Sequence, residues 1–227
     1  MYRDVLILAF LALVIFPLVG CEMTYNKLKA DLTAKPVDMS NGKVEKEVSA
    51  EIPSLPQKFT LPVPHNPARQ YGPDCGPDSL RMVLNYYGKG VREGDIVRQL
   101  KSRGKYGGVT LSQLARIARG YDLEAYIMAG LNLEILKALL VNKWPPIVAY
   151  RARRDVGHAV VVVGYDDTKK RLMVNDPNFV RVSRIPYHDF IPAWRQFGGS
   201  CLLVVPKGIK QSDILAAIRR YVSFEIR

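Results

Sequence analysis

The sequence predicts an α+β domain in which helices come first and an antiparallel sheet fills the C-terminal half. Two patterns support this: apolar residues recur at helical spacing between positions 80 and 140, and short apolar runs bounded by turn residues follow position 146. Helices followed by clustered strands favour α+β over a doubly wound sheet. The 227 residues are 48% hydrophobic and 24% charged, which excludes bulk disorder and collagen-like repeats.

The first helix is expected over residues 77–87. Its buried stripe is formed by four apolar residues at positions i, i+3, i+4 and i+7, namely Leu80, Val83, Leu84 and Tyr87. Pro77 suits the first turn of a helix, and Gly88 suits its end.

Two more helices carry their own start signals. Thr110 and Gln113 form a capping-box pattern in front of Leu111, Leu114 and Ile117, and Gly120 is the stop. Asn132 caps a third helix that Pro145 ends.

The strands follow these helices. Four are expected, over residues 147–150, 158–165, 171–175 and 200–205. A C-terminal stretch then carries apolar residues at helical spacing, and residues 207–227 are predicted to form a helical extension.

The N-terminal sequence is typical of a secretion signal. An uncharged apolar run from Val5 to Val19 ends in Leu18-Val19-Gly20-Cys21, which resembles the lipobox of bacterial lipoproteins. This resemblance implies that residues 1–20 are a removed signal peptide and that Cys21 is diacylated, which would hold the protein stably on a membrane. The alternative is an uncleaved anchor helix. Either way, we expect the chain in the cell envelope outside the cytoplasm. Because Glu22 is not the Asp that marks inner-membrane retention, the periplasmic side of the outer membrane is a candidate destination.

Residues 21–64 are expected to form a lipidated N-terminus and an extended tether. Pro53, Pro56, Pro62 and Pro64 stiffen its second half, which can also add an edge strand. The globular domain is then predicted over 65–206. A net charge of +12 favours anionic partners such as lipid headgroups or acidic wall polymers.

Cys75 is the candidate nucleophile. It lies at the N-terminus of the first predicted helix, where unpaired backbone N–H groups and the helix dipole stabilise a thiolate. Gln70, five residues earlier, could supply a side-chain amide that completes an oxyanion hole with the Cys75 backbone N–H. The alternative is a small buried cysteine at a helix start, which by itself is the commoner case.

His158 is the candidate base, and Asp176 is its candidate partner. His158 opens a valine-rich strand, and Asp176-Pro177 follows the next one. A hairpin centred on residue 167 would place His158 and Asp176 opposite each other at its open end, on one face of the sheet. A carboxylate there would hold one ring nitrogen and leave the other for the cysteine. The alternative is an ordinary surface Asp-Pro turn.

Other chemistries lack the motifs they need. His65 and His188 show no metal-ligand spacing, so no metal or cofactor is expected. There is no phosphate-binding loop, and no aromatic-basic interleaving that would suggest nucleic acid. Cys201 lies in a predicted apolar strand, so we expect it to be a buried residue of the core.

Three separated segments together resemble the peptidase C39 family of papain-like cysteine peptidases, known for trimming leader peptides after a double-glycine site. They are Gln70 with Asp74-Cys75-Gly76-Pro77, Gly157-His158-Ala-Val-Val-Val, and Asn175-Asp176-Pro177. The resemblance implies a papain-like fold, with Cys75 as nucleophile, His158 as general base and acid, Asp176 as the residue that orients it and Gln70 as oxyanion donor.

The implied activity is hydrolysis of peptide bonds through a thioester by a membrane-anchored cysteine peptidase. The membrane-spanning and ATP-hydrolysing segments of bacteriocin exporters do not occur in the chain, so we expect a stand-alone type acting on peptides or proteins, with a separate export machinery as a candidate partner. Two alternatives stay open. One is a non-catalytic peptide- or wall-binding module, and the other is an amidase or endopeptidase on peptidoglycan stem peptides.

Overall fold

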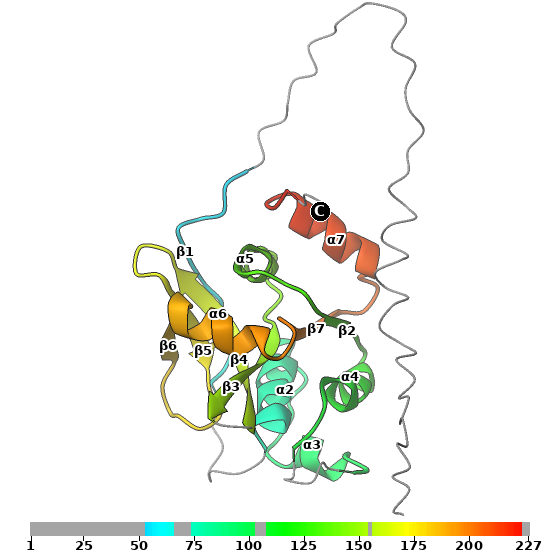
Figure 1. Ribbon diagram of the computed structural model, residues 1–227. Helices are drawn as coiled ribbons and strands as arrows, with labels where there is room; N and C mark the ends of the chain where they lie inside the picture. Colours follow the sequence, from blue (N-terminus) through cyan, green and yellow to red (C-terminus); the bar gives the residue numbers. More distant parts are fainter. Residues whose placement is uncertain (1–52, 66–73, 103–107, 154–155, 224–227) are drawn as a thin grey trace, which may run out of the picture. The chain divides into compact units, whose positions relative to one another are not determined.

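The computed structural model describes residues 53–65, 74–102, 108–153 and 156–223, without the side chains of 152, 153 and 156 (Figure 1). The predicted signal peptide, Cys21, most of the tether and Gln70 lie outside these residues. No helix within them is long and apolar enough to span a bilayer.

One antiparallel sheet organises the described residues. Its strands follow the order β2-β7-β3-β4-β5-β6, and β1 pairs with β4. The bounds are β1 Lys58–Thr60, β2 Leu123–Met128, β3 Ile147–Arg153, β4 Val156–Asp166, β5 Arg171–Asn175, β6 Ser183–Pro186 and β7 Cys201–Pro206. The expected α+β class is confirmed.

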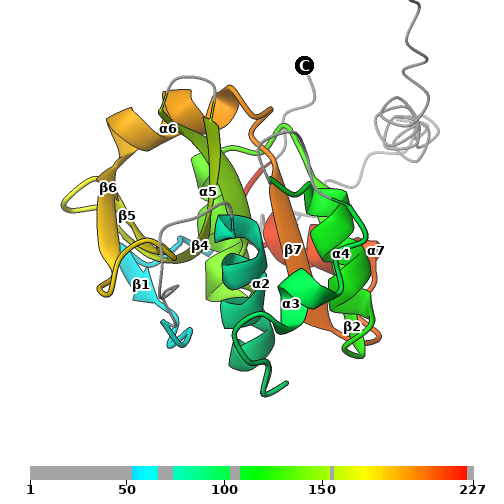
Figure 2. The same ribbon diagram turned by 90° about the horizontal axis from the view of Figure 1, so that it is seen from below.

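The helices cover both faces of the central strands. They are α2 Cys75–Tyr86, α3 Asp95–Arg98, α4 Leu111–Arg119, α5 Leu133–Val141, α6 Tyr187–Arg195 and α7 Gln211–Arg219. Figure 2 shows α2 and α4 in front of β4 and β7, and α7 behind them. Helix α2 packs on β4, α4 packs on β2 and β7, and α6 packs on β3.

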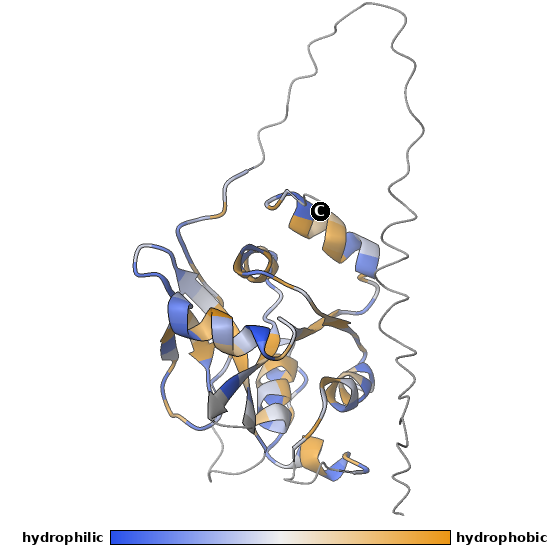
Figure 3. Ribbon diagram, in the orientation of Figure 1, coloured by the Kyte–Doolittle hydropathy of each residue, from blue (hydrophilic) through white to orange (hydrophobic). Residues whose placement is uncertain are grey.

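The core lies between these layers. The valine run of β4, Val160–Val163, is almost wholly buried, as expected for a strand covered on both faces. Figure 3 shows apolar residues gathered on the central strands, whereas α4 and α7 carry both polar and apolar residues. In α4 the buried residues are Leu114, Ala115, Ile117 and Ala118, so the helix buries one face only.

The predicted helix signals act as expected. The Thr110 hydroxyl accepts from the Gln113 N–H at 3.2 Å and the Gln113 amide oxygen accepts from the Thr110 N–H at 2.8 Å, which closes the capping box. The Asn132 side chain accepts from Ile135 N at 2.9 Å. Helix α5 ends at Val141, four residues before Pro145.

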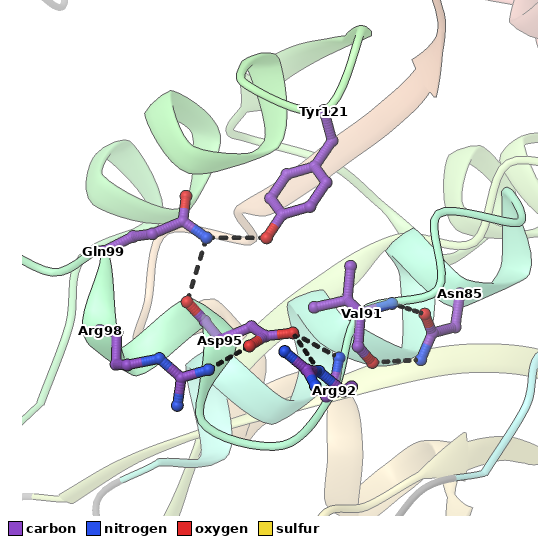
Figure 4. A network of polar contacts seen from close by, with 7 residues as sticks. All are labelled: Asn85, Val91, Arg92, Asp95, Arg98, Gln99 and Tyr121. Carbon is purple, nitrogen blue, oxygen red and sulfur yellow. Dashed lines mark hydrogen bonds and ion pairs between the residues drawn. The ribbon is translucent and has the colours of Figure 1, made fainter.

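A polar network holds the connection between α2 and α4 (Figure 4). The Asn85 side chain both accepts from Val91 N and donates to Val91 O, at 2.6 and 2.9 Å. The Gln99 amide donates to Tyr121 Oη at 2.7 Å and to the backbone oxygen of Asp95, and Asp95 pairs with Arg98. These bonds hold the start of the connection on α2 and tie α3 to Tyr121, which follows α4.

The start of the domain differs from the sequence prediction, which placed it at residue 65. Strand β1 pairs with the second half of β4, and Leu61 N donates to Val163 O at 2.7 Å. Leu61 and Val63 are buried in the core, and the compact unit begins at Ala50. Residues 53–64 are therefore part of the domain, because alternate side chains of this proline-rich segment fill its core.

Candidate active site

Cys75 is the first residue of α2, and α2 is bound directly to the strand that carries His158. The Ser79 hydroxyl, on the fifth residue of the helix, donates to the backbone oxygen of Ala159 at 3.1 Å and so holds α2 on β4. Cys75 is half-buried. Gly76 lets the neighbouring loop approach, since a Cβ there would lie 2.7 Å from Val109 Cγ2.

His158 and Asp176 form a buried pair. His158 Nε2 donates to Asp176 Oδ1 at 2.8 Å, and both side chains are at least nine-tenths buried. The same carboxylate oxygen accepts from Asn178 N at 2.9 Å, within a turn that follows β5. Two donors therefore hold the carboxylate in place, and the bond to Nε2 leaves His158 Nδ1 for another partner.

The register that led to this pair was predicted wrongly. In the structure Val161 lies opposite Asn175 and Val162 opposite Val174, and a bulge follows at Val163. The observed pairing of β4 with β5 is thus shifted by two residues from the pairing of a hairpin centred on residue 167. A shift by an even number of residues keeps every side chain on its face of the sheet, so His158 and Asp176 still meet as diagonal neighbours.

Hydrogen bonding and charge couple the pKa of the Cys75 thiol to that of the His158 ring. Burial by itself would raise the pKa of the thiol, but this hydrogen bonding, the Ala159 backbone and the charge of His158 outweigh it, so the pKa of Cys75 lies below its ordinary value. Burial opposes the charge of His158 too, yet the bonds to Asp176 and Cys75 raise its pKa to about 9. Both shifts favour the thiolate–imidazolium pair over the neutral thiol and imidazole.

Two residues near the pair were not singled out as site residues from the sequence. Tyr150 is the cross-strand partner of His158, and the two rings meet edge to face with centroids 5.8 Å apart. His65, considered only as a weak metal ligand, donates from Nε2 to the backbone oxygen of Asp176 at 3.1 Å. A strand register would have found Tyr150, whereas no local pattern indicates the contact of His65.

A cleft of about 320 Å³ opens beside the Cys75 sulfur. Its lining is mostly apolar and comes from five parts of the chain: Cys75, Gly76, Gly108, Val109, Thr110, Leu111, Leu114, Ala149, Gly157, Ala159, Phe197 and Ser200. A cleft next to an activated thiol can hold one stretch of an extended peptide.

Gln70 and Cys21 lie outside the described residues, so the structure does not test their roles. Cys201 is wholly buried in β7, as expected from the sequence, and burial raises the pKa of its thiol to about 12. Of the two cysteines in the described residues, Cys75 is the one that lines a cleft and has a lowered pKa.

Solved structures share this fold. A C39-like peptidase from Bacillus anthracis aligns over 66% of this chain and 98% of its own, with a TM-score of 0.57 and 21% identity. A double glycine motif protease from an AMS/PCAT transporter, solved with its leader peptide, aligns over 66% and 95%, with a TM-score of 0.51 and 27% identity. Xylellain, a cysteine protease from Xylella fastidiosa, aligns over 77% and 94%, with a TM-score of 0.52 and 12% identity. These likenesses establish the papain-like cysteine peptidase fold.

A comparison with curated proteins found no match. The model of the Peptidase_C39 like family matches residues 50–202, a range that begins at the start of the compact unit and includes Cys75, His158 and Asp176. The chain therefore belongs to the Peptidase_C39 like family and carries a cysteine peptidase domain of the papain-like fold.

Proposed function

We propose that this chain hydrolyses peptide bonds with Cys75 as nucleophile, His158 as general base and acid, and Asp176 as the residue that orients His158. The observation that carries the proposal is a series of three groups: the Cys75 thiol at the start of α2, the buried His158 ring that lowers the pKa of this thiol, and the Asp176 carboxylate hydrogen-bonded to that ring. This series lies beside a cleft open to a peptide. A pure binding module has no need of a thiol whose pKa is lowered by a buried histidine.

The chemistry follows from these positions. The Cys75 thiolate attacks the peptide carbonyl carbon, and the resulting oxyanion faces the backbone N–H groups at the start of α2, with Gln70 as the proposed second donor. Protonated His158 gives its proton to the amine nitrogen as the C–N bond breaks, which leaves a thioester on Cys75. Neutral His158 then takes a proton from water. The hydroxide attacks the thioester, and the C–S bond breaks to release the acid.

The proposed substrates are peptides or proteins outside the cytoplasm. The transporter protease in the comparison was solved with a leader peptide, which supports a peptide substrate and makes a separate export machinery a reasonable partner. Peptidoglycan stem peptides, also amides, are the second substrate class to test.

We test the activity with a synthetic decapeptide library read by mass spectrometry. Wild-type protein should cut it, while Cys75→Ala and His158→Ala should not, although their circular dichroism stays native. Purified peptidoglycan forms a parallel arm, and Cys75-dependent fragments there alone would assign the activity to stem peptides. Cleavage that survives in Cys75→Ala would refute the mechanism, and peptide binding without turnover would favour a binding module.

We further propose that diacylated Cys21 anchors the protein in the cell envelope, most simply on the periplasmic side of the outer membrane. The apolar run followed by Leu18-Val19-Gly20-Cys21 supports this. Expressed in a Gram-negative host, the wild-type chain should enter the detergent phase of Triton X-114 and Cys21→Ser the aqueous phase. Equal partitioning of the two would refute the anchor.

A further inference from the structure

Arg151 lies next to the cleft on the strand face that lines it. Ala149 of β3 and its cross-strand partner Ala159 both line the cleft beside Cys75. Two residues farther along, Arg151 lies opposite Gly157, which also lines the cleft. Because side chains alternate along a strand, Arg151 projects from the same face as Ala149. The pairing is regular as far as Arg151, and the irregularity of β3 comes after it.

The guanidinium of Arg151 is available to a ligand. The side chain is exposed, and it makes no ion pair with any residue of the described ranges. The neighbouring wall is different in character, since Val109, Leu111, Leu114 and Phe197 are apolar. The site therefore offers an apolar pocket that Cys75 lines, with the Arg151 guanidinium beside it.

The distance along β3 between Ala149 and Arg151 determines which ligand can contact both the apolar cleft and the guanidinium. Two residues of a strand span about 6.6 Å, which is also the length of two residues of an extended peptide. A peptide that places an apolar side chain in the cleft would bring a residue one or two positions from the scissile bond beside Arg151. A guanidinium binds a carboxylate there with charge-assisted hydrogen bonds.

We propose that Arg151 is a specificity-determining residue that binds an acidic side chain within two residues of the bond that is cut. This deepens the proposed peptidase function and rests on it for its biological meaning. Arg151 does not touch the reacting atoms, so its loss changes the choice of substrate and leaves the chemistry of Cys75 intact.

The test uses reagents that label Cys75 without turnover. Iodoacetyl peptides carry either Glu or Gln at the first or second residue after the reactive carbon, and the second-order rate of labelling is measured for each. In the wild-type protein we expect the Glu reagent to react about tenfold faster than its Gln partner at one of the two positions. The ratio should fall as salt rises from 0.05 to 0.5 M, because the guanidinium is exposed.

Arg151→Gln should bring the ratio to about one, while its rate with plain iodoacetamide stays at the wild-type level. Arg219→Gln is the matched control, since Arg219 is an exposed arginine at the end of α7, which packs on α5. It should keep the full preference. Equal rates for the Glu and Gln reagents in wild type, or a preference that persists in Arg151→Gln, would overturn the assignment.

The decapeptide library separates this proposal from the proposed function. Absence of any Cys75-dependent cleavage refutes the peptidase proposal, and the labelling ratios still decide the role of Arg151. Cleavage with no enrichment of Asp or Glu near the cut sites, together with equal labelling rates, refutes the role of Arg151 alone.

Discussion

Asp176 Oδ1 accepts a hydrogen bond from His158 Nε2 at 2.8 Å, although the β4–β5 ladder does not set the two residues opposite each other. The contact depends on the turn after β5, where Asn178 N donates to the same oxygen, and on His65, which holds the Asp176 backbone. The position of the carboxylate is therefore set by a turn and by the N-terminal segment, and only indirectly by the sheet.

Asp176→Asn should lower kcat by on the order of a hundredfold or more, because the amide can still accept from Nε2 but no longer stabilises an imidazolium by charge. The pKa of His158, about 9, is raised by Asp176, so it falls in the variant. Imidazolium is lost as pH rises through that pKa, and the alkaline limb of the activity profile should therefore move to lower pH. Asp189→Asn, in an exposed residue of α6, should leave both limbs in place. An unchanged alkaline limb in Asp176→Asn would contradict this role.

His158→Gln should make Cys75 a slow nucleophile. The hydrogen bond and charge of His158 lower the pKa of the thiol, and without them the burial that remains raises it. The midpoint of iodoacetamide labelling against pH should lie below 9 in wild type and above 9 in the variant. Buried Cys201 is the internal control, because it should stay unlabelled until the protein unfolds. A shared midpoint would show that His158 does not activate the thiol.

A chain that begins at residue 66 should lose much of its stability compared with one that begins at Ala50. It lacks β1 and the buried side chains of Leu61 and Val63, each of which contributes about 1.5–3 kcal/mol. Urea unfolding of the two chains measures the difference. If the shorter chain fails to fold, Leu61→Ala should still cost about 2–5 kcal/mol. Equal stability of the two chains would show that residues 53–65 are only a tether.

These N-terminal residues also show where the sequence is insufficient. The helix caps at Thr110 and Asn132 are local patterns, and each helix begins where its cap predicts. Leu61 and Val63 stand among prolines, and their burial depends on the open edge of β4, more than 95 residues later in the chain. The predicted register failed for a related reason, since the turn of the hairpin lies beyond residue 167 and the bulge at Val163 leaves no mark in a continuous valine run. The pairing of His158 and Asp176 was still predicted, because the error was an even number of residues.

Lys137→Met should destabilise the fold by roughly 2–4 kcal/mol. Lys137 Nζ is buried and pairs with Asp167 Oδ1 at 2.7 Å and with Glu134 Oε1 at 3.0 Å, between the rings of Tyr165 and Tyr187. Removing the cation leaves Asp167 without its countercharge at a largely buried site, and only the half-exposed Glu134 regains water. Urea unfolding should show the loss, whereas Lys169→Met on the exposed turn should change stability by less than about 0.5 kcal/mol. Similar values for the two variants would assign the cluster no structural role.

Gly157→Ala should weaken substrate binding with little effect on stability. An added Cβ would lie 2.8 Å from Cε1 and Cζ of Phe197, and the tip of this ring can swing aside at low cost. Both residues line the cleft, so the displaced ring should change the shape of the cleft and raise KM severalfold, while labelling of Cys75 by the small reagent iodoacetamide continues at the wild-type rate.

Gly108→Ala is the matched control, because Gly108 also lines the cleft but has no atom within 4 Å of an added Cβ. The double variant Gly157→Ala/Phe197→Leu should recover most of the lost binding, since the shorter side chain removes the clash. A KM that stays at the wild-type value in Gly157→Ala, or a loss that Phe197→Leu does not relieve, would show that the contact between Gly157 and Phe197 does not shape the substrate site.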